Sequence, residues 1–202
     1  MALIVLDGPP GAGKTTVGRS LHERLNVPLI HEVVGECRES ITLYGVRDPA
    51  RDEIVGNMAL VLASDLRKHE WARELDGAGR IVLMDRNYLY TLAVAKCITK
   101  AFCIDVFSHA LGWFRSHRTD LQRPAAYIYL DLPVELINRR TGRASNSTDP
   151  LTHEQAAREV LHDLACIRHA EDPGVPFHRV DATTAPLEVH EAVRRILNGY
   201  AA

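Results

Sequence analysis

Short apolar runs alternate along the chain with segments of helical periodicity. Runs of five to seven mostly apolar residues are typical of strands buried in a parallel sheet, and they occur at 2–6, 27–31, 80–85, 125–131 and 177–182. Between them, apolar residues recur every three or four positions, which predicts helices over 14–25, 50–76, 88–117 (two helices, broken near Lys100), 133–141, 152–171 and 185–199. This alternation predicts an α/β protein of a single domain over residues 1–202, with a parallel sheet covered by helices on both faces.

Polar residues follow three of the predicted strands. They are Asp7, the pair His31 and Glu32, and the pair Asp85 and Arg86. In such sheets, ligands bind at the carboxyl ends of the strands, so we expect the functional site there.

The loop after the first strand has the spacing of a P-loop. Residues 8–15 read GPPGAGKT, with Gly8, Gly13, Lys14 and Thr15 at the diagnostic positions. Glycines let backbone N–H groups approach phosphate oxygens, the lysine reaches the β- and γ-phosphates, and the threonine hydroxyl ligates Mg²⁺. A chance glycine-rich turn is the alternative, but the predicted strand, loop and helix favour the P-loop. The residues expected to hold ATP here are Gly8, Pro10, Gly11, Ala12, Gly13, Lys14, Thr15 and Thr16.

Asp85 and Arg86 come at the end of a predicted strand. The aspartate would hold Mg²⁺ or accept a proton from the acceptor, and the arginine would clamp the acceptor or the transferred phosphoryl group. The alternative is a capped helix start with a surface ion pair. Glu32 offers a general base at the end of the second strand, or an ordinary strand-end charge.

A basic cluster precedes a polar, turn-rich stretch. Arg139, Arg140 and Arg143 lie beside GRASNSTDP at 142–150, which predicts a mobile loop and, with the arginines, a lid over roughly 139–150. Arg143 is the first choice for a catalytic role in the lid, and Arg139 is a further candidate for binding ATP. A solvated helix end is the competing interpretation. The charges around Arg67 to Glu74 are interpreted as a solvated helix face.

Composition adds mainly exclusions. The net charge of −2 favours neither nucleic acid nor an anionic membrane as a partner. The chain has no apolar run of roughly 18 residues and no signal-peptide pattern before the P-loop, so we expect no membrane association and a cytoplasmic location. No C-x-x-C pair or metal-ligand spacing occurs among the four cysteines, which we expect to be buried or free thiols.

Four motifs in order give the chain a family likeness. ALIVLDGPPGAGKTT, GRIVLMDRNYLYTLA, YIYLDLPVELINRR and VDATTAPLEVHEAV together resemble the thymidylate kinase family of P-loop kinases, with the deoxynucleoside kinases close behind. The resemblance covers almost the whole chain and implies a P-loop NTPase fold with a five-stranded parallel sheet and a short lid. It implies that Arg86 contacts the acceptor, that a lid arginine lies near the adenine or the phosphates, and that Ala182 and Thr183 lie against the adenine. It also suggests a homodimer through the helices at 50–76 and 88–117.

The departures from thymidylate kinases fall mostly on the acceptor side. Pro10 replaces a P-loop aspartate of that family, and HEVVGE replaces the turn after its second strand. Val94 and Ala95 stand where the family has polar side chains, and Leu66 replaces an arginine, with Arg67 one place later.

The residues alone leave the acceptor class open, while the whole-chain resemblance to a nucleotide kinase favours a nucleotide-like small molecule as the acceptor. A hydroxyl acceptor must lose a proton, for which Glu32 and Asp85 are candidates, whereas a phosphate acceptor needs cations such as Arg86 with Arg47 or Arg51. The sequence therefore predicts ATP- and Mg²⁺-dependent phosphoryl transfer to a nucleoside monophosphate, a nucleoside or a related small molecule. The alternatives are a kinase for a non-nucleotide hydroxyl, such as a sugar or an antibiotic, and an ATP-binding regulatory switch.

Overall fold

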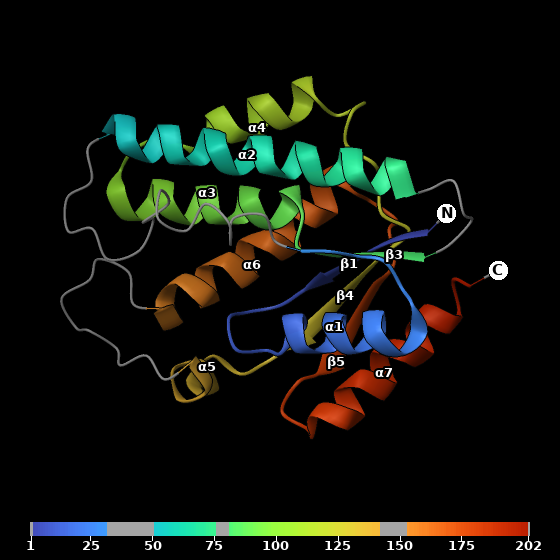
Figure 1. Cartoon of the computed structure of the whole chain (residues 1–202). Helices are drawn as coiled ribbons and strands as arrows, with labels where there is room; N and C mark the ends of the chain where they lie inside the picture. Colours follow the sequence, from blue (N-terminus) through green and yellow to red (C-terminus); the bar gives the residue numbers. More distant parts are fainter. Residues whose placement is uncertain (1, 32–50, 76–80, 142–152, 202) are drawn as a thin grey trace.

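Five parallel strands form the centre of the molecule. The computed structural model describes residues 2–31, 51–75, 81–141 and 153–201. The strands are β1 (Ala2–Asp7), β2 (Leu29–Ile30), β3 (Ile81–Asp85), β4 (Ala126–Asp131) and β5 (Phe177–Asp181). Their order in the sheet is β2-β3-β1-β4-β5, and all the pairings are parallel (Figure 1). The predicted five-stranded parallel sheet is confirmed.

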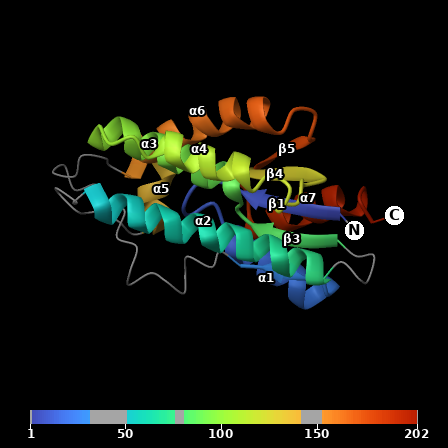
Figure 2. The same ribbon diagram turned by 90° about the horizontal axis from the view of Figure 1, so that it is seen from above.

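Helices cover both faces of this sheet, as predicted. They are α1 (Lys14–Leu25), α2 (Arg51–Glu74), α3 (Tyr88–Phe102), α4 (Phe107–Ser116), α5 (Val134–Thr141), α6 (His153–Glu171) and α7 (Pro186–Asn198). Figures 1 and 2 show α2, α3, α4 and α6 on one side of the sheet, with α1 and α7 on the other.

The alternation of side chains along each strand supplies a separate core to each face. Val5 of β1 packs with Tyr127 and residues of α2, α3, α4 and α6, whereas its neighbours Ile4 and Leu6 pack with residues of α1 and α7. Successive strand residues point to opposite faces, so one buried strand serves both cores.

Most element boundaries differ from the sequence prediction by one or two residues, and two of the differences have a clear local cause. The strand expected over 27–31 is only Leu29–Ile30, at the edge of the sheet, where Pro28 has no N–H to donate. The break between α3 and α4 comes after Lys100, where Cys103 has a left-handed φ of 55°. The Thr99 hydroxyl accepts the N–H groups of Val106 and Phe107, which holds the chain reversal.

The central position of β1 brings the P-loop and Asp85 to the same edge of the sheet. Leu6 of β1 is in register with Asp85 of β3, and Asp7 is in register with Tyr129 of β4. The loop after β1 and the turn after β3 are therefore neighbours at the carboxyl ends of the strands.

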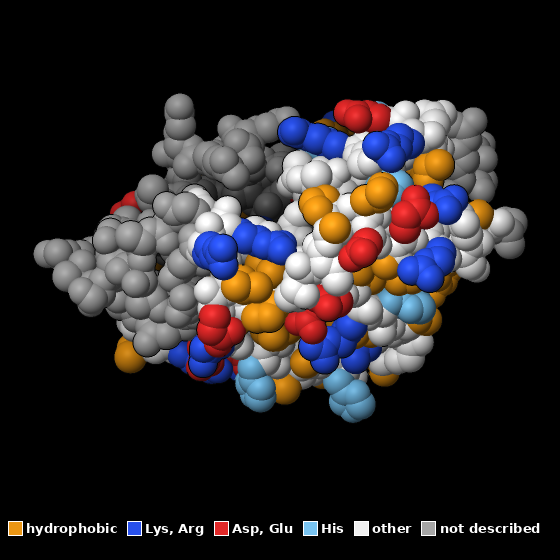
Figure 3. Space-filling model, turned by 90° about the horizontal axis from the view of Figure 1, so that it is seen from below, with side chains coloured by type: hydrophobic (Ala, Val, Ile, Leu, Met, Phe, Trp, Pro, Cys, Tyr) orange, Lys and Arg blue, Asp and Glu red, His pale blue; other side chains and the backbone are white. Residues whose placement is uncertain are grey.

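The surface on the side of α1 and α7 is mixed in charge. Figure 3 shows this side from below, with basic and acidic side chains interspersed among small hydrophobic patches. None of the helices in the described part of the chain is long and apolar enough to cross a membrane.

Candidate active site

The P-loop has the tight backbone conformation that its glycines were expected to allow. Gly8 has φ 144°, and a Cβ there would lie 2.6 Å from the carbonyl oxygen of Leu130, so the loop passes directly against β4. Gly13 has φ 92° at the N-cap of α1, where no side chain caps the helix. The first N–H groups of α1 are thus left for a ligand, and an anion is the ligand that they favour.

Lys14 lies at the centre of this loop. Its side chain is buried, and its Nζ donates to the carbonyl oxygens of Gly8 at 2.8 Å and Pro9 at 3.0 Å. Thr15 and Thr16 follow in the first turn of α1, and both are exposed. A tight glycine backbone, an open helix N-terminus and a central ammonium group fit the polyphosphate of a nucleotide.

Asp7 lies beneath the loop. Its Oδ1 accepts the N–H of Gly8 at 2.7 Å, and its Oδ2 is buried without a hydrogen-bond partner among the described residues. Burial raises the pKa of this carboxyl from 3.8 to about 6, against the opposing effect of the nearby Arg86 guanidinium. The sequence marked Asp7 as polar but did not predict this perturbed group.

Asp85 and Arg86 lie beside the P-loop, as predicted. Asp85 is buried at the end of β3, and the backbone N–H of Arg86 donates to the carbonyl of Leu6 at 3.0 Å. The Arg86 guanidinium stacks over the Tyr90 ring at 4.1 Å, and its Nη2 lies 3.4 Å from the carbonyl oxygen of Gly8. The cap of α3 comes from Asn87, whose Oδ1 accepts the N–H of Leu89. Arg86 is therefore placed between the P-loop and α3.

The solvated face predicted around Arg67 to Glu74 is wrong for two of its residues. Arg67 and Glu70 are exposed and paired with each other, but Lys68 is only 3% exposed and His69 is fully buried. Burial lowers the pKa of His69 to about 3, and its Nδ1 accepts the N–H of Gln122.

Lys68 is the site residue that the sequence analysis missed. Its Nζ pairs with Asp65 at 2.8 Å and donates to the carbonyl of Arg86 at 3.0 Å. Helical periodicity contained a signal, because the buried stripe of α2 continues through polar positions: Ile54, Met58, Leu62, Asp65, His69 and Ala72. Lys68 follows Asp65 by three residues and so falls on the same side of the helix.

The base of the predicted lid lies against the P-loop. A Cβ on Gly11 would lie 3.2 Å from the Cβ of Arg140 and 3.3 Å from Cγ2 of Thr141, so the last turn of α5 packs on the loop. Arg139 is exposed in the same turn. The remainder of the lid, with Arg143, lies outside the described residues, and so does Glu32.

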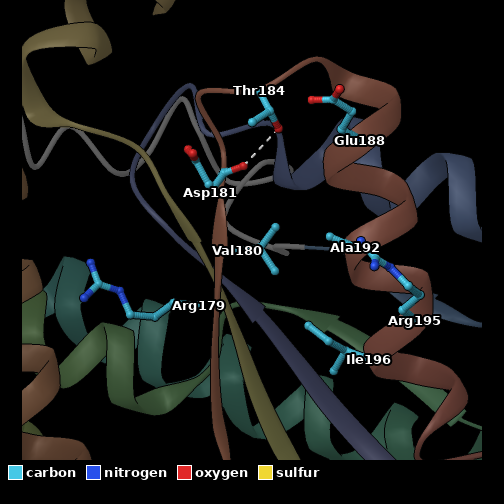
Figure 4. A pocket seen from close by; sticks show the side chains of 8 residues that line it. All are labelled: Arg179, Val180, Asp181, Thr184, Glu188, Ala192, Arg195 and Ile196. Atoms are coloured by element: carbon cyan, nitrogen blue, oxygen red, sulfur yellow. Dashed lines mark hydrogen bonds between the residues drawn. The ribbon is translucent and has the colours of Figure 1, made fainter.

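The loop after β5 holds the two residues expected near the adenine. Ala182 is fully buried in the core and its N–H donates to the carbonyl of Asp131, while Thr183 is exposed and donates its N–H and hydroxyl to Asp181. An open hollow of about 560 Å³ adjoins this loop between β5 and α7. Figure 4 shows Val180 directed toward α7, and Arg179 on the other side of the strand.

The predicted Mg²⁺ ligands offer two oxygen groups, the hydroxyl of Thr15 and the carboxylate of Asp85. Within the described residues, no three His, Cys, Asp or Glu side chains gather in a group that could hold a metal ion. Mg²⁺ bound through one carboxylate and substrate phosphates needs no such group, so these residues fit it.

Comparisons with known proteins agree with this architecture. Residues 3–183 match the model of a family described as AAA domain. Among solved structures, deoxyadenosine kinase from M. mycoides with the products dCMP and a flexible dCDP bound matches with a TM-score of 0.74 and 18% identity, over 98% of this chain and 99% of that one. The same kinase with bound dATP matches with a TM-score of 0.74 and 17% identity, over 97% and 99%.

These findings confirm the predicted P-loop fold. At such identities, the likeness to the solved structures shows the fold alone. The more specific resemblance to thymidylate kinases stays a prediction.

Proposed function

This chain belongs to the AAA domain family, and from that premise we propose that it is a P-loop kinase, transferring the γ-phosphoryl group of ATP to a hydroxyl group of a nucleoside or a similar small molecule. The observation that carries the proposal is the placement of Asp85 and Arg86 against the P-loop. Lys14, Arg86 and Asp85 all act electrostatically on Asp7, so a lysine, an arginine and a carboxylate lie near the P-loop, as phosphoryl transfer requires.

The P-loop would bind the triphosphate. The N–H groups at the start of α1 and the ammonium of Lys14 would hold the phosphate oxygens, with Lys14 moving from its own loop carbonyls to the ligand. Thr15 and Asp85 would hold Mg²⁺, which when bound neutralises charge on the phosphates. The loop at Ala182 and Thr183 would lie against the adenine.

Arg86 would act on the transferred group. Stacking on Tyr90 limits the directions in which its guanidinium can point, so less order is lost when it binds a phosphoryl oxygen. We also propose that Glu32 is the general base and that Arg143, with Arg139, belongs to a lid that closes over ATP.

A hydroxyl acceptor is favoured over a phosphate acceptor by the surroundings of α2 and α3. Leu66, at the position of a thymidylate kinase arginine, packs on the apolar core, as do Val94 and Ala95. Arg67 does not replace that arginine, because it is 55% exposed and paired with Glu70. The two solved structures named above are both of a kinase that is named for a nucleoside, deoxyadenosine.

An acceptor screen tests the proposal. ATP turnover would be measured with deoxynucleosides, nucleoside monophosphates, sugars and no acceptor. We expect turnover with a nucleoside-type acceptor, and a loss of about 100-fold or more in Lys14→Ala, because one charge-assisted contact to the transition state is removed. ATP binding without turnover on any acceptor would favour the regulatory switch instead.

The same assay with two further variants identifies the accepting group. With a hydroxyl acceptor, Glu32→Gln should abolish transfer while both ligands still bind, and the acidic limb of the pH–rate profile should disappear. If Glu32→Gln remains active while Arg86→Ala loses both acceptor affinity and kcat, the acceptor is a phosphate.

A further inference from the structure

We infer that Lys68, held by Asp65, positions the turn that carries Asp85 and Arg86, and that phosphoryl transfer depends on this contact. The inference rests on the proposed function, because it assigns a positioning residue to the same site. Lys68 would touch neither ATP nor the acceptor, so it acts through the backbone of Arg86.

The contacts of Lys68 converge on one short backbone segment. Its Nζ donates to the carbonyl oxygen of Arg86 at 3.0 Å and lies 3.5 Å from that of Asp85. These carbonyls belong to the two residues whose side chains the proposed reaction uses. A lysine in the C-terminal half of α2 thus holds the backbone at the end of β3.

The gripped segment has a conformation that needs support. Arg86 has φ 57°, in the left-handed region that non-glycine residues enter only at an energetic cost. Its N–H is held by Leu6 and its carbonyl by Lys68, so both backbone groups of the strained residue have partners. This conformation turns the side chain of Arg86 from β3 toward Tyr90 and the P-loop.

A buried ammonium must itself be compensated. Lys68 and Asp65 are each 3% exposed at the side chain, with Nζ and Oδ1 2.8 Å apart. The other oxygen of Asp65 accepts the hydroxyl of Thr91, which lies on α3. A chain of contacts therefore runs from α3 through Asp65 and Lys68 of α2 to the turn after β3.

Such a pair is a poor choice for stability alone. Replacing a buried ion pair by apolar residues of similar volume is often neutral or stabilising. The pair does, however, fix one position for the carbonyls that it bonds. That property suits a turn whose arginine must meet a phosphoryl group, since an error of 1 Å can cost about 100-fold in rate.

A double-mutant cycle between Lys68 and Arg86 tests the inference. Lys68→Met should lower kcat by about 10- to 100-fold while the Kd for ATP changes by less than about threefold, because the P-loop itself is intact. In an Arg86→Ala background, Lys68→Met should lower kcat by less than about threefold, since the group that it positions is already gone. A merely structural lysine would give independent, multiplicative losses.

Two further variants provide a control and a substitute for Lys68→Met. Lys96→Met is the control, because Lys96 also pairs with a buried aspartate, Asp163 at 2.9 Å, but further along α3. It should change thermal stability without changing kcat. Thr91→Val keeps the side-chain shape, removes only the hydroxyl that holds Asp65, and should show a smaller loss of kcat that also vanishes with Arg86→Ala. Thr91→Val takes the place of Lys68→Met in the cycle if Lys68→Met does not fold.

Hydrogen exchange separates this inference from the proposed function. Amides in residues 85–91 should exchange faster in Lys68→Met or Thr91→Val, but not in Lys96→Met. If the wild-type protein phosphorylates nothing, the proposed function fails and exchange alone decides whether Lys68 fixes the turn. If the protein is an active kinase and the losses from Lys68→Met and Arg86→Ala multiply, the inference is overturned while the function stands.

Discussion

At the scale of single residues, the carboxyl group of Asp7 has an environment that is unfavourable for a charge. It lies under the P-loop with Oδ2 buried, and burial raises its pKa to about 6. The unfolded chain loses this proton near the ordinary value of 3.8, while the native protein retains it to about 6. The stability of the native protein therefore falls as the pH rises through this window, and the loss is complete above it.

Asp7→Asn should remove this loss. The amide can still accept the N–H of Gly8 through its oxygen, and it stays neutral at all pH values. At about 1.4 kcal/mol per pKa unit, the variant should gain at most about 3 kcal/mol over wild type above pH 6.5, and almost nothing near pH 4. Urea denaturation from pH 4 to 8 would measure this difference.

Asp181→Asn provides a control of opposite sign. The hydroxyl and N–H of Thr183 hold the pKa of the exposed Asp181 carboxyl below its ordinary value, so its contribution to stability is present above that value and is lost as the pH falls. Its amide should not stabilise the protein at pH 7. A stability difference between Asp7→Asn and wild type that does not change with pH would contradict the assignment.

Residue chemistry was predictable where it depends on neighbours in the sequence. The P-loop pattern needs only Gly8, Gly13, Lys14 and Thr15 at fixed spacing after a strand, so the sequence was sufficient to predict this loop. The burial of Lys68 depends on how α2 packs against α3 and β3. A charged residue in a predicted helix is expected to be exposed to solvent. The partners of Lys68 are Asp65 and the carbonyl of Arg86, which lie on two different elements.

At the scale of elements, Asp172 ties together segments that meet just after α6 ends. Fully buried, it accepts the hydroxyls of Tyr88 at 2.8 Å and Tyr127 at 2.6 Å, and it pairs with Arg118 at 2.7 Å. Tyr88 begins α3 and Tyr127 belongs to β4. The same network reaches Asn87, whose Nδ2 donates to the hydroxyl of Tyr127.

Asp172→Ala should therefore destabilise the protein strongly. Removing the carboxylate leaves a cation and two buried hydroxyls without their acceptor, which costs about 3–5 kcal/mol when one partner of a buried pair is lost. Tyr127→Phe is the matched variant, because it removes one hydroxyl and should cost about 1 kcal/mol. Equal losses in urea denaturation for the two variants would show that Asp172 is not the centre of the network.

The elements themselves were predicted closely, and the errors have local causes. Apolar runs and helical spacing located every strand and helix of the described residues to within a few positions. The strand predicted over 27–31 is longer than β2. An apolar run shows which residues are buried, but it does not show that only two of them pair with the neighbouring strand. It placed the break after α3 too early, because the hydroxyl of Thr99 caps a turn several residues further on.

At the scale of the whole molecule, the arrangement of the strands joins the parts of the site. The hydrophobic pattern of the sequence predicts five parallel strands. Their arrangement as a P-loop NTPase fold was implied by the family resemblance and not by the periodicity. Strand order depends on pairing between distant segments, such as β1 with β3 and β4. A homodimer through α2, α3 and α4 and a cytoplasmic location remain predictions.

Binding of ATP with Mg²⁺ at the junction of these strands should stabilise the whole fold. A ligand at 100 times its Kd adds about 2.7 kcal/mol to the free energy of unfolding. For a chain of this size, each kcal/mol raises Tm by roughly 2–4 °C, so a shift of roughly 5–10 °C is expected.

Lys14→Ala should show a much smaller shift at the same ATP concentration, because the ammonium at the centre of the loop is gone. Omitting Mg²⁺ should reduce the wild-type shift, since Thr15 and Asp85 would hold the ion, which would neutralise charge on the phosphates. Equal shifts in the wild type and in Lys14→Ala, measured by differential scanning calorimetry, would place the nucleotide elsewhere on the molecule.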